Sequence, residues 1–137
     1  MKKLSFILYL LPWFLSSFLV DTNFYNSLNL PFFAIKPIVF TIAWTIIYIL
    51  IALSIYYNEK SREYIKILLI NYVFNQLYLF CFFTLRSPFL GFLDTLGILV
   101  TTLLLYLEID RKKLLIPYII FDIYAVILSL TIYFMNL

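Results

Sequence analysis

The chain has 137 residues, of which 65% are hydrophobic and 12% are charged, and its formal net charge is +3. An ordinary soluble domain has roughly 45 to 50% apolar and about 25% charged residues, and a soluble protein of this length must cover much of its surface with polar groups. The composition therefore excludes an ordinary water-soluble fold and indicates a protein embedded in lipid.

The sequence has no histidine and a single cysteine, Cys81. Histidine-ligated metals and haem, Cys/His metal clusters, Ser/His/Asp and Cys/His catalytic sets, and internal disulfides all lack their side chains. The small and scattered net charge gives no reason to expect a nucleic-acid partner. An enzyme is therefore the least favoured class, and neither a cofactor nor a metal is expected.

Five apolar runs are long enough to cross a bilayer, which takes about 20 helical residues. Only helices and closed barrels satisfy their backbone groups in lipid, and runs of this length favour helices over barrel strands. The expected spans are residues 4–20, 37–57, 64–84, 89–107 and 114–136. The sequence thus predicts an all-α membrane protein, a five-transmembrane-helix bundle that forms one domain over residues 1–137.

The first span carries Pro12, which should kink it because proline removes a backbone hydrogen bond. Lys2 and Lys3 before an apolar stretch would also fit a signal peptide. The run is long, however, and no small-residue cleavage site follows Ser16 and Ser17. A membrane helix is therefore the favoured interpretation.

Proline and polar residues mark the later boundaries. Pro37 and Pro88 stand where the second and fourth spans should begin, because a helix accepts proline in its first turn. Residues 58–61 and 108–113 are polar breaks after the same two spans. These signals separate the five helices independently of their hydropathy.

Lysine and arginine are distributed unequally between the two sides of the predicted bundle. One side has Lys36 and Arg86, whereas the other has eight basic residues, which are Lys2, Lys3, Lys60, Arg62, Lys66, Arg111, Lys112 and Lys113. The positive-inside rule then predicts a multi-pass protein with a cytoplasmic N-terminus and a C-terminus outside. The longest connection, residues 21–36, would lie on the outer face and is expected to cover a cavity.

Two acids fall within the predicted spans. Asp122 lies eight positions into the last span, roughly 12 Å deep at about 1.5 Å per residue. Such a residue is either functional or a neutral acid that joins helices, for instance through an amide such as Asn75. Asp94 is nearer the interface, where a carboxylate that headgroup water reaches or that pairs with Arg86 is favoured.

The third span presents two amides and two rings on one helix face. Asn71, Asn75, Tyr78 and Phe82 have spacings of four, three and four residues, which bring side chains onto one side of a helix. Buried amides in lipid need partners, so this face should point inward. It could orient a ligand or simply hold helices together.

Trp44 and Tyr48 form a similar pair, four residues apart, on the second span. Lys36 precedes this span beside the 21–36 loop, where its amine could meet an anionic group of a ligand. The alternative is an ordinary lysine that extends to the interface.

Three blocks of the chain, in order, resemble the translocator protein family TspO/MBR, whose members are also called tryptophan-rich sensory proteins. Residues 31–48, PFFAIKPIVFTIAWTIIY, resemble its loop and second helix. Residues 71–83 are similar to its third helix, and residues 115–125 to its fifth-helix Pro-Tyr signature. The resemblance extends over residues 25–137 and implies a five-helix bundle.

The chain departs from the family pattern at several aromatic positions. The usual loop tryptophan is Phe33, the third-helix tryptophan is Tyr78, and the fifth-helix tryptophan is Phe121. Ser129 replaces a late asparagine, and Asp122 stands where an apolar residue is expected. The resemblance is therefore to a divergent member.

The resemblance implies a cavity near the 21–36 loop that binds a porphyrin, another tetrapyrrole or a sterol-like molecule, often in a homodimer. Membrane lipid is the other expected partner. Porphyrin degradation is not expected, because Trp44 is the only plausible cavity tryptophan. The expected ligand-binding residues are Phe33, Lys36, Trp44, Tyr48, Asn71, Asn75, Tyr78, Tyr118, Phe121 and Asp122. The alternatives are a small transporter or exporter with Asp122 as its proton-linked residue, and a scaffold that binds no ligand.

Overall fold

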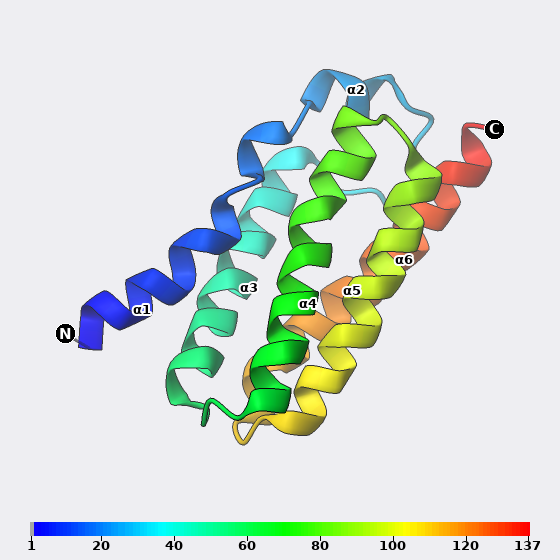
Figure 1. Ribbon diagram of the computed structural model, residues 1–137. Helices are drawn as coiled ribbons and strands as arrows, with labels where there is room; N and C mark the ends of the chain where they lie inside the picture. Colours follow the sequence, from blue (N-terminus) through cyan, green and yellow to red (C-terminus); the bar gives the residue numbers. More distant parts are fainter. Residues whose placement is uncertain (1) are drawn as a thin grey trace.

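The computed structural model describes residues 2–137, which are predominantly helical and contain no strand (Figure 1). The elements in chain order are α1 (Lys2–Leu10), η1 (Leu11–Phe14), η2 (Ser17–Leu19), α2 (Thr22–Ser27), α3 (Pro37–Tyr57), α4 (Arg62–Leu79), the π-helix η3 (Phe80–Thr84), α5 (Pro88–Glu108), η4 (Lys112–Leu115) and α6 (Ile116–Met135).

Five stretches of these helices are long and apolar enough to cross a membrane. They are Lys2–Leu19, Pro37–Tyr57, Arg62–Thr84, Pro88–Glu108 and Lys112–Met135. Each bound lies within two residues of the span expected from the sequence. The five-helix prediction is therefore confirmed for the part of the chain that the structure describes.

Local signals in the sequence begin these helices. Pro37 and Pro88 occupy the first turns of α3 and α5, as predicted. The Ser61 hydroxyl accepts the Tyr64 amide at 3.1 Å at the start of α4, and Ser87 caps α5 in the same way. Because the first amides of a helix have no partner inside it, these side chains fix where each helix starts.

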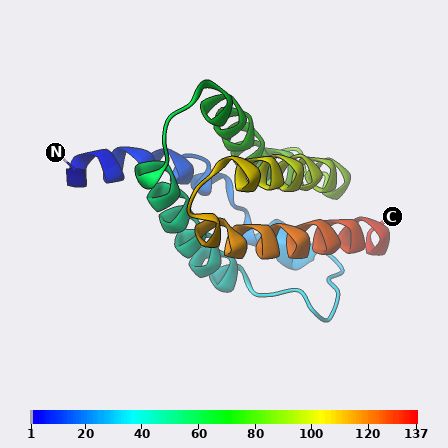
Figure 2. The same ribbon diagram turned by 90° about the horizontal axis from the view of Figure 1, so that it is seen from below.

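Helices α3 to α6 pack together, whereas α1 leans away from them in both views (Figures 1 and 2). The turns after α3 and α5 lie at one end of the bundle, and α2 lies at the other. None of the residues of α1 is buried. The core inside the bundle includes Ile47, Ile51 and Tyr118.

The chain breaks its first span at Pro12, as predicted. Helix α1 ends at Leu10, and two short 3-10 turns follow. A break in lipid frees backbone groups that no water can satisfy. Gln76 of α4 supplies the partners, because its amide nitrogen donates to the Trp13 carbonyl and its oxygen accepts the Ser16 amide, both at 3.0 Å. Tyr72 donates to the Pro12 carbonyl at 3.0 Å.

Candidate ligand cavity

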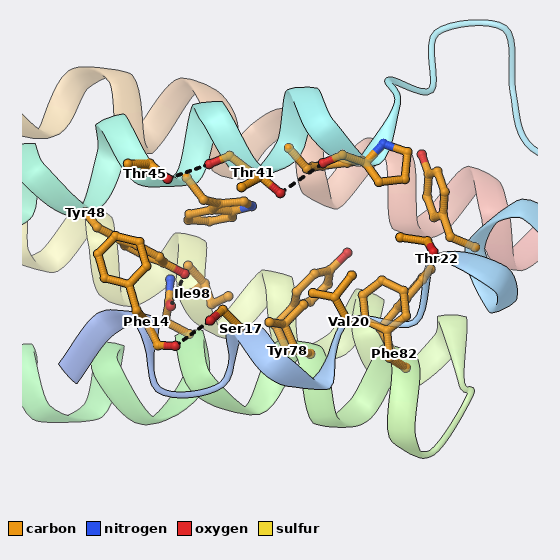
Figure 3. Close-up of a pocket in the computed structure, with 17 residues that line it drawn as sticks. Phe14, Ser17, Val20, Thr22, Thr41, Thr45, Tyr48, Tyr78, Phe82 and Ile98 are labelled. Carbon is orange, nitrogen blue, oxygen red and sulfur yellow. Dashed lines mark hydrogen bonds between the residues drawn. The ribbon is translucent and has the colours of Figure 1, made fainter. Parts of the chain in front are cut away.

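The broken part of the first span forms one side of a cavity of about 370 Å³, with α3 opposite (Figure 3). Phe14, Ser17 and Val20 line the first side. Helix α4 and its π-helical end supply Asn75, Tyr78, Leu79, Phe82 and Phe83. The lining includes seven hydroxyl-bearing residues, one amide and one indole among apolar side chains, and none of the described lining residues is charged.

Helix α3 contributes a regular stripe to the cavity. Its lining residues are Pro37, Phe40, Thr41, Trp44, Thr45 and Tyr48, which follow the i, i+3, i+4, i+7 pattern of one helix face. The Thr41 and Thr45 hydroxyls donate to backbone carbonyls one turn earlier in α3. Their methyl groups and the aromatic rings are therefore what α3 presents to a ligand.

Trp44 is held in position by aromatic side chains from two helices. Its ring lies 5.6 Å from that of Tyr48 on the same helix, at a small tilt. From α6, Phe121 contacts it edge-on at 5.1 Å and Tyr118 at 6.1 Å. Offset and edge-on contacts of this kind are favourable, so the indole is fixed in its orientation before any ligand arrives.

A chain of buried hydrogen bonds starts from the cavity wall. The Tyr48 hydroxyl donates to the Asn75 side-chain oxygen at 3.2 Å, and the Asn75 nitrogen donates to the Tyr118 hydroxyl at 3.1 Å. Tyr118 donates in turn to the Asn71 oxygen at 2.9 Å. The two amides of α4 are thus linked through a tyrosine of α6.

The chain continues to Asp122, which is 1% exposed. Asn71 donates to the Thr102 hydroxyl at 3.0 Å. That hydroxyl lies 2.9 Å from an Asp122 carboxyl oxygen and 2.7 Å from the Ile98 carbonyl. Because the Thr102 hydroxyl has one proton for these two acceptors, the hydrogen bonds of the site would be satisfied best if Asp122 were protonated. The suggested bond between Asp122 and Asn75 is wrong, since Thr102 is the partner found.

Asp94 also differs from its predicted setting. Arg86 lies 3.7 Å from Asp21, whereas Asp94 is buried in α5. The Oδ2 atom of Asp94 has no hydrogen-bond partner among the residues that the structure describes. The predicted pairing of Asp94 with Arg86 is therefore wrong, because Arg86 is exposed on the turn that faces Asp21.

The 21–36 segment covers one end of the cavity and is fastened to the bundle. Tyr25 lines the cavity and donates to the Ile35 carbonyl at 2.8 Å. Burial, with a smaller contribution from Tyr124, raises the pKa of Tyr25 to about 12. The Tyr124 hydroxyl donates to the Phe33 carbonyl at 2.8 Å and accepts the Ile35 amide at 3.3 Å.

The structure brings four of the ten expected ligand-binding residues to the cavity wall. These are Trp44, Tyr48, Asn75 and Tyr78. Tyr118 and Phe121 stand behind Trp44, and Asn71 and Asp122 belong to the hydrogen-bond chain.

Phe33 and Lys36 lie outside this arrangement. The Phe33 ring packs against Tyr124 at 6.4 Å. Lys36 is exposed immediately before α3, next to Pro37, which does line the cavity. Phe14, Ser17 and Val20 line it without having been expected, because nothing in the first span distinguishes them from lipid-facing residues.

These features define a class of protein, a multi-pass membrane protein with five apolar helices and an aromatic cavity lined mainly by the first span, α3 and α4. The chain belongs to the TspO/MBR family, whose model matches residues 4–135. It is 34% identical to the tryptophan-rich protein TspO of Bacillus cereus over 99% of both chains. It is also 35% identical to the uncharacterized membrane protein YtaB of Bacillus subtilis, over 88% of this chain and 84% of that protein. These matches confirm the resemblance inferred from the three sequence blocks.

Proposed function

We propose that the cavity binds a flat hydrophobic molecule, such as a porphyrin or a sterol-like compound. The observation that carries this proposal is the orientation of Trp44, fixed by Tyr118 and Phe121 at the wall of a cavity of about 370 Å³. Ligand cavities usually measure about 300 to 1,000 Å³ and combine apolar walls with a few polar groups. Tyr48 and Asn75, joined by a hydrogen bond, are two of the polar groups in this wall.

The uncharged lining favours a ligand whose inserted part is neutral. An acidic group on such a ligand would remain at the mouth, where Lys36 stands one residue before Pro37. This assigns Lys36 to the entrance and the aromatic residues to the ring system. Membership of a family that includes a tryptophan-rich protein TspO is consistent with this assignment.

The test is a titration of the purified protein with protoporphyrin, followed by tryptophan fluorescence and by porphyrin absorbance. The absorbance keeps the assay readable when a tryptophan is removed. Trp44→Leu should weaken binding by about 2- to 10-fold, the equivalent of one lost aromatic contact. Trp13→Leu is the comparison, made after a check that the variant folds, and it should weaken binding less, because Trp13 packs on Tyr48 and Tyr72 and does not line the cavity.

Equal losses in the two variants, or none in either, would remove Trp44 from the site. A sterol that displaces the porphyrin would place both ligand types in the same cavity. A sterol that binds without displacing it would restrict the proposal to porphyrins.

The hydrogen-bond chain from Tyr48 to Asp122 supports a second candidate, a transporter in which Asp122 is linked to proton movement. An ionisable residue within the membrane suits a proton relay. Proteoliposomes with an imposed pH gradient test this alternative against simple binding. Movement of substrate with the gradient, abolished in Asp122→Asn while binding survives, would establish transport.

We also propose that the N-terminus is cytoplasmic and the C-terminus outside, because eight basic residues lie on one side and two on the other. The start of α1 and the end of α6 lie at opposite sides of the bundle in Figure 1, as an odd number of spans requires. Reporter fusions that place the C-terminus in the cytoplasm would overturn this orientation.

A further inference from the structure

A second hollow lies outside the bundle, between the start of α1 and the end of α3. It is an open groove of about 440 Å³. Helix α1 lines it with Lys2, Lys3, Phe6 and Ile7, and α3 lines it with residues that include Leu53 and Tyr57. This groove is separate from the aromatic cavity, with which it shares no lining residue.

The groove combines a cationic rim with apolar walls. Lys2 and Phe6 are four residues apart, as are Lys3 and Ile7, so each lysine stands one helical turn beyond an apolar side chain. Neither lysine is in an ion pair, since the ion pair found among residues 2–137 joins Arg86 and Asp21. Their charges are therefore free to attract an anion.

A third cation stands beside the groove. The Arg111 guanidinium lies 4.1 Å from the centre of the Tyr57 ring, in the geometry of a cation–π contact. Tyr57 is itself a lining residue. Positive charge thus gathers at the rim from α1 and from the turn after α5.

Helix α1 is held to the core only near its end, where Tyr9 and Leu10 pack against it. None of its residues is buried, and it diverges from the other helices in both views (Figures 1 and 2). A groove between a membrane helix and its neighbour must contain lipid or protein, because an empty apolar gap loses contact energy. A chain-like apolar molecule with an anionic end matches both the walls and the rim.

We propose that this groove is a binding site for one anionic diacyl phospholipid. Its phosphate lies between the Lys2 and Lys3 amines, and one acyl chain runs along Phe6, Ile7 and Leu53. Basic pockets between membrane helices bind anionic headgroups in this manner. The lipid holds α1 against α3, and the proposal does not depend on what occupies the aromatic cavity.

Native mass spectrometry of the purified protein tests the site, with phosphatidylglycerol and phosphatidylcholine of identical acyl chains as probes. Phosphatidylglycerol should be retained in preference to phosphatidylcholine. Each basic residue near a membrane surface contributes about fivefold to the affinity for anionic lipid. The Lys2→Gln/Lys3→Gln variant should therefore lose about 25-fold in affinity for phosphatidylglycerol.

The matched control is Lys66→Gln/Lys113→Gln, which removes the same charge from exposed lysines outside the groove. It should change the affinity by less than about twofold. Equal losses in the two double variants would show that only the general surface charge matters and would overturn the proposal, as would equal retention of the two lipids.

A third variant separates shape from charge. Leu53→Trp fills the groove and leaves all lysines in place, so it should reduce phosphatidylglycerol retention as well. Soluble glycerol phosphate should not compete, because it has no acyl chain to occupy the walls. Full retention by Leu53→Trp, or displacement by glycerol phosphate, would refute the groove as the lipid site. Folding of each variant is checked by its thermal transition.

Discussion

Removing the side chain of Gln76 should loosen the wall of the aromatic cavity. Gln76 bonds the Trp13 carbonyl and the Ser16 amide, both at 3.0 Å, and these groups have lost their helical partners at the break after Leu10. In Gln76→Leu both groups remain in an apolar setting without a partner. Because Phe14 and Ser17 lie in the same segment and line the cavity, the ligand should bind more weakly too.

The magnitude follows from these two bonds. Hydrogen bonds between membrane helices contribute about 0.6 kcal/mol each on average, which sets a lower limit of about 1 kcal/mol for the loss of unfolding free energy. A buried unsatisfied group costs about 1 to 3 kcal/mol, which sets an upper limit of about 6 kcal/mol. We expect a value of about 2 to 3 kcal/mol, since the segment can relax toward other partners.

Two measurements check this prediction. Reversible unfolding in mixed micelles gives the free energy, and hydrogen exchange of residues 11–19 gives the local opening. Leu77→Ala is the control, because Leu77 is the next residue of α4 and is 40% exposed. If Gln76→Leu left both the unfolding free energy and the exchange of residues 11–19 unchanged, Gln76 would not hold the break.

Four other predictions use different features of the structure. Asp122→Asn should keep its fold and its protoporphyrin affinity, because the new amide can still bond Thr102. Asp122→Leu should lower the unfolding free energy by about 1 to 3 kcal/mol. Equal stability of the two variants would show that the bond is unimportant. Gly97→Ala would place a methyl group 2.8 Å from the Phe74 ring and should lower the unfolding free energy by about 1 to 3 kcal/mol. Adding Phe74→Leu to this variant should restore part of that free energy. The bond from Tyr25 to the Ile35 carbonyl should persist below pH 10 and weaken as the pH rises toward the raised pKa of about 12, because the ionised oxygen cannot donate. Hydrogen exchange of residues 21–36 should therefore accelerate more over this pH range in the native chain than in Tyr25→Phe, which lacks the bond at every pH. A parallel response of both proteins would contradict this role. The family resemblance favours a homodimer. Its interface should use bulky side chains, because residues 64–84 contain no glycine or alanine that would let helices approach closely. A monomer by light scattering in mild detergents, without crosslinking in native membranes, would exclude the homodimer.

The spans could be predicted from the sequence because their signals are local. A run of about 20 apolar residues is sufficient for a membrane helix, and Pro12, Pro37 and Pro88 act on their own backbone. The stripe of lining residues on α3 follows from a local pattern as well, since Phe40, Thr41 and Thr45 stand at helical spacing from Trp44 and Tyr48. Only Trp44 and Tyr48 could be predicted, because hydroxyl and apolar residues cannot be told apart by pattern on a lipid-facing helix.

Partners between helices could not be predicted in this way. The choice of Thr102 rather than Asn75 by Asp122 depends on how α5 and α6 are placed against each other. Likewise, Phe14 and Ser17 join the cavity only because the chain breaks at Pro12 and is then bonded to α4, opposite α3. Packing between distant segments decides these contacts, and hydropathy does not encode it.

The lack of buried residues in α1 has a consequence for how freely its sequence can vary. A helix that contacts mainly acyl chains is constrained by length and apolarity, since fluid lipid adapts to any side-chain shape. Substitutions among leucine, isoleucine, valine and phenylalanine at Leu4 and Leu8, which are both more than half exposed, should therefore be nearly interchangeable in a mutational library. Trp13, at 3% exposed, should tolerate almost none, so tolerance along the first span should fall abruptly where the helix breaks.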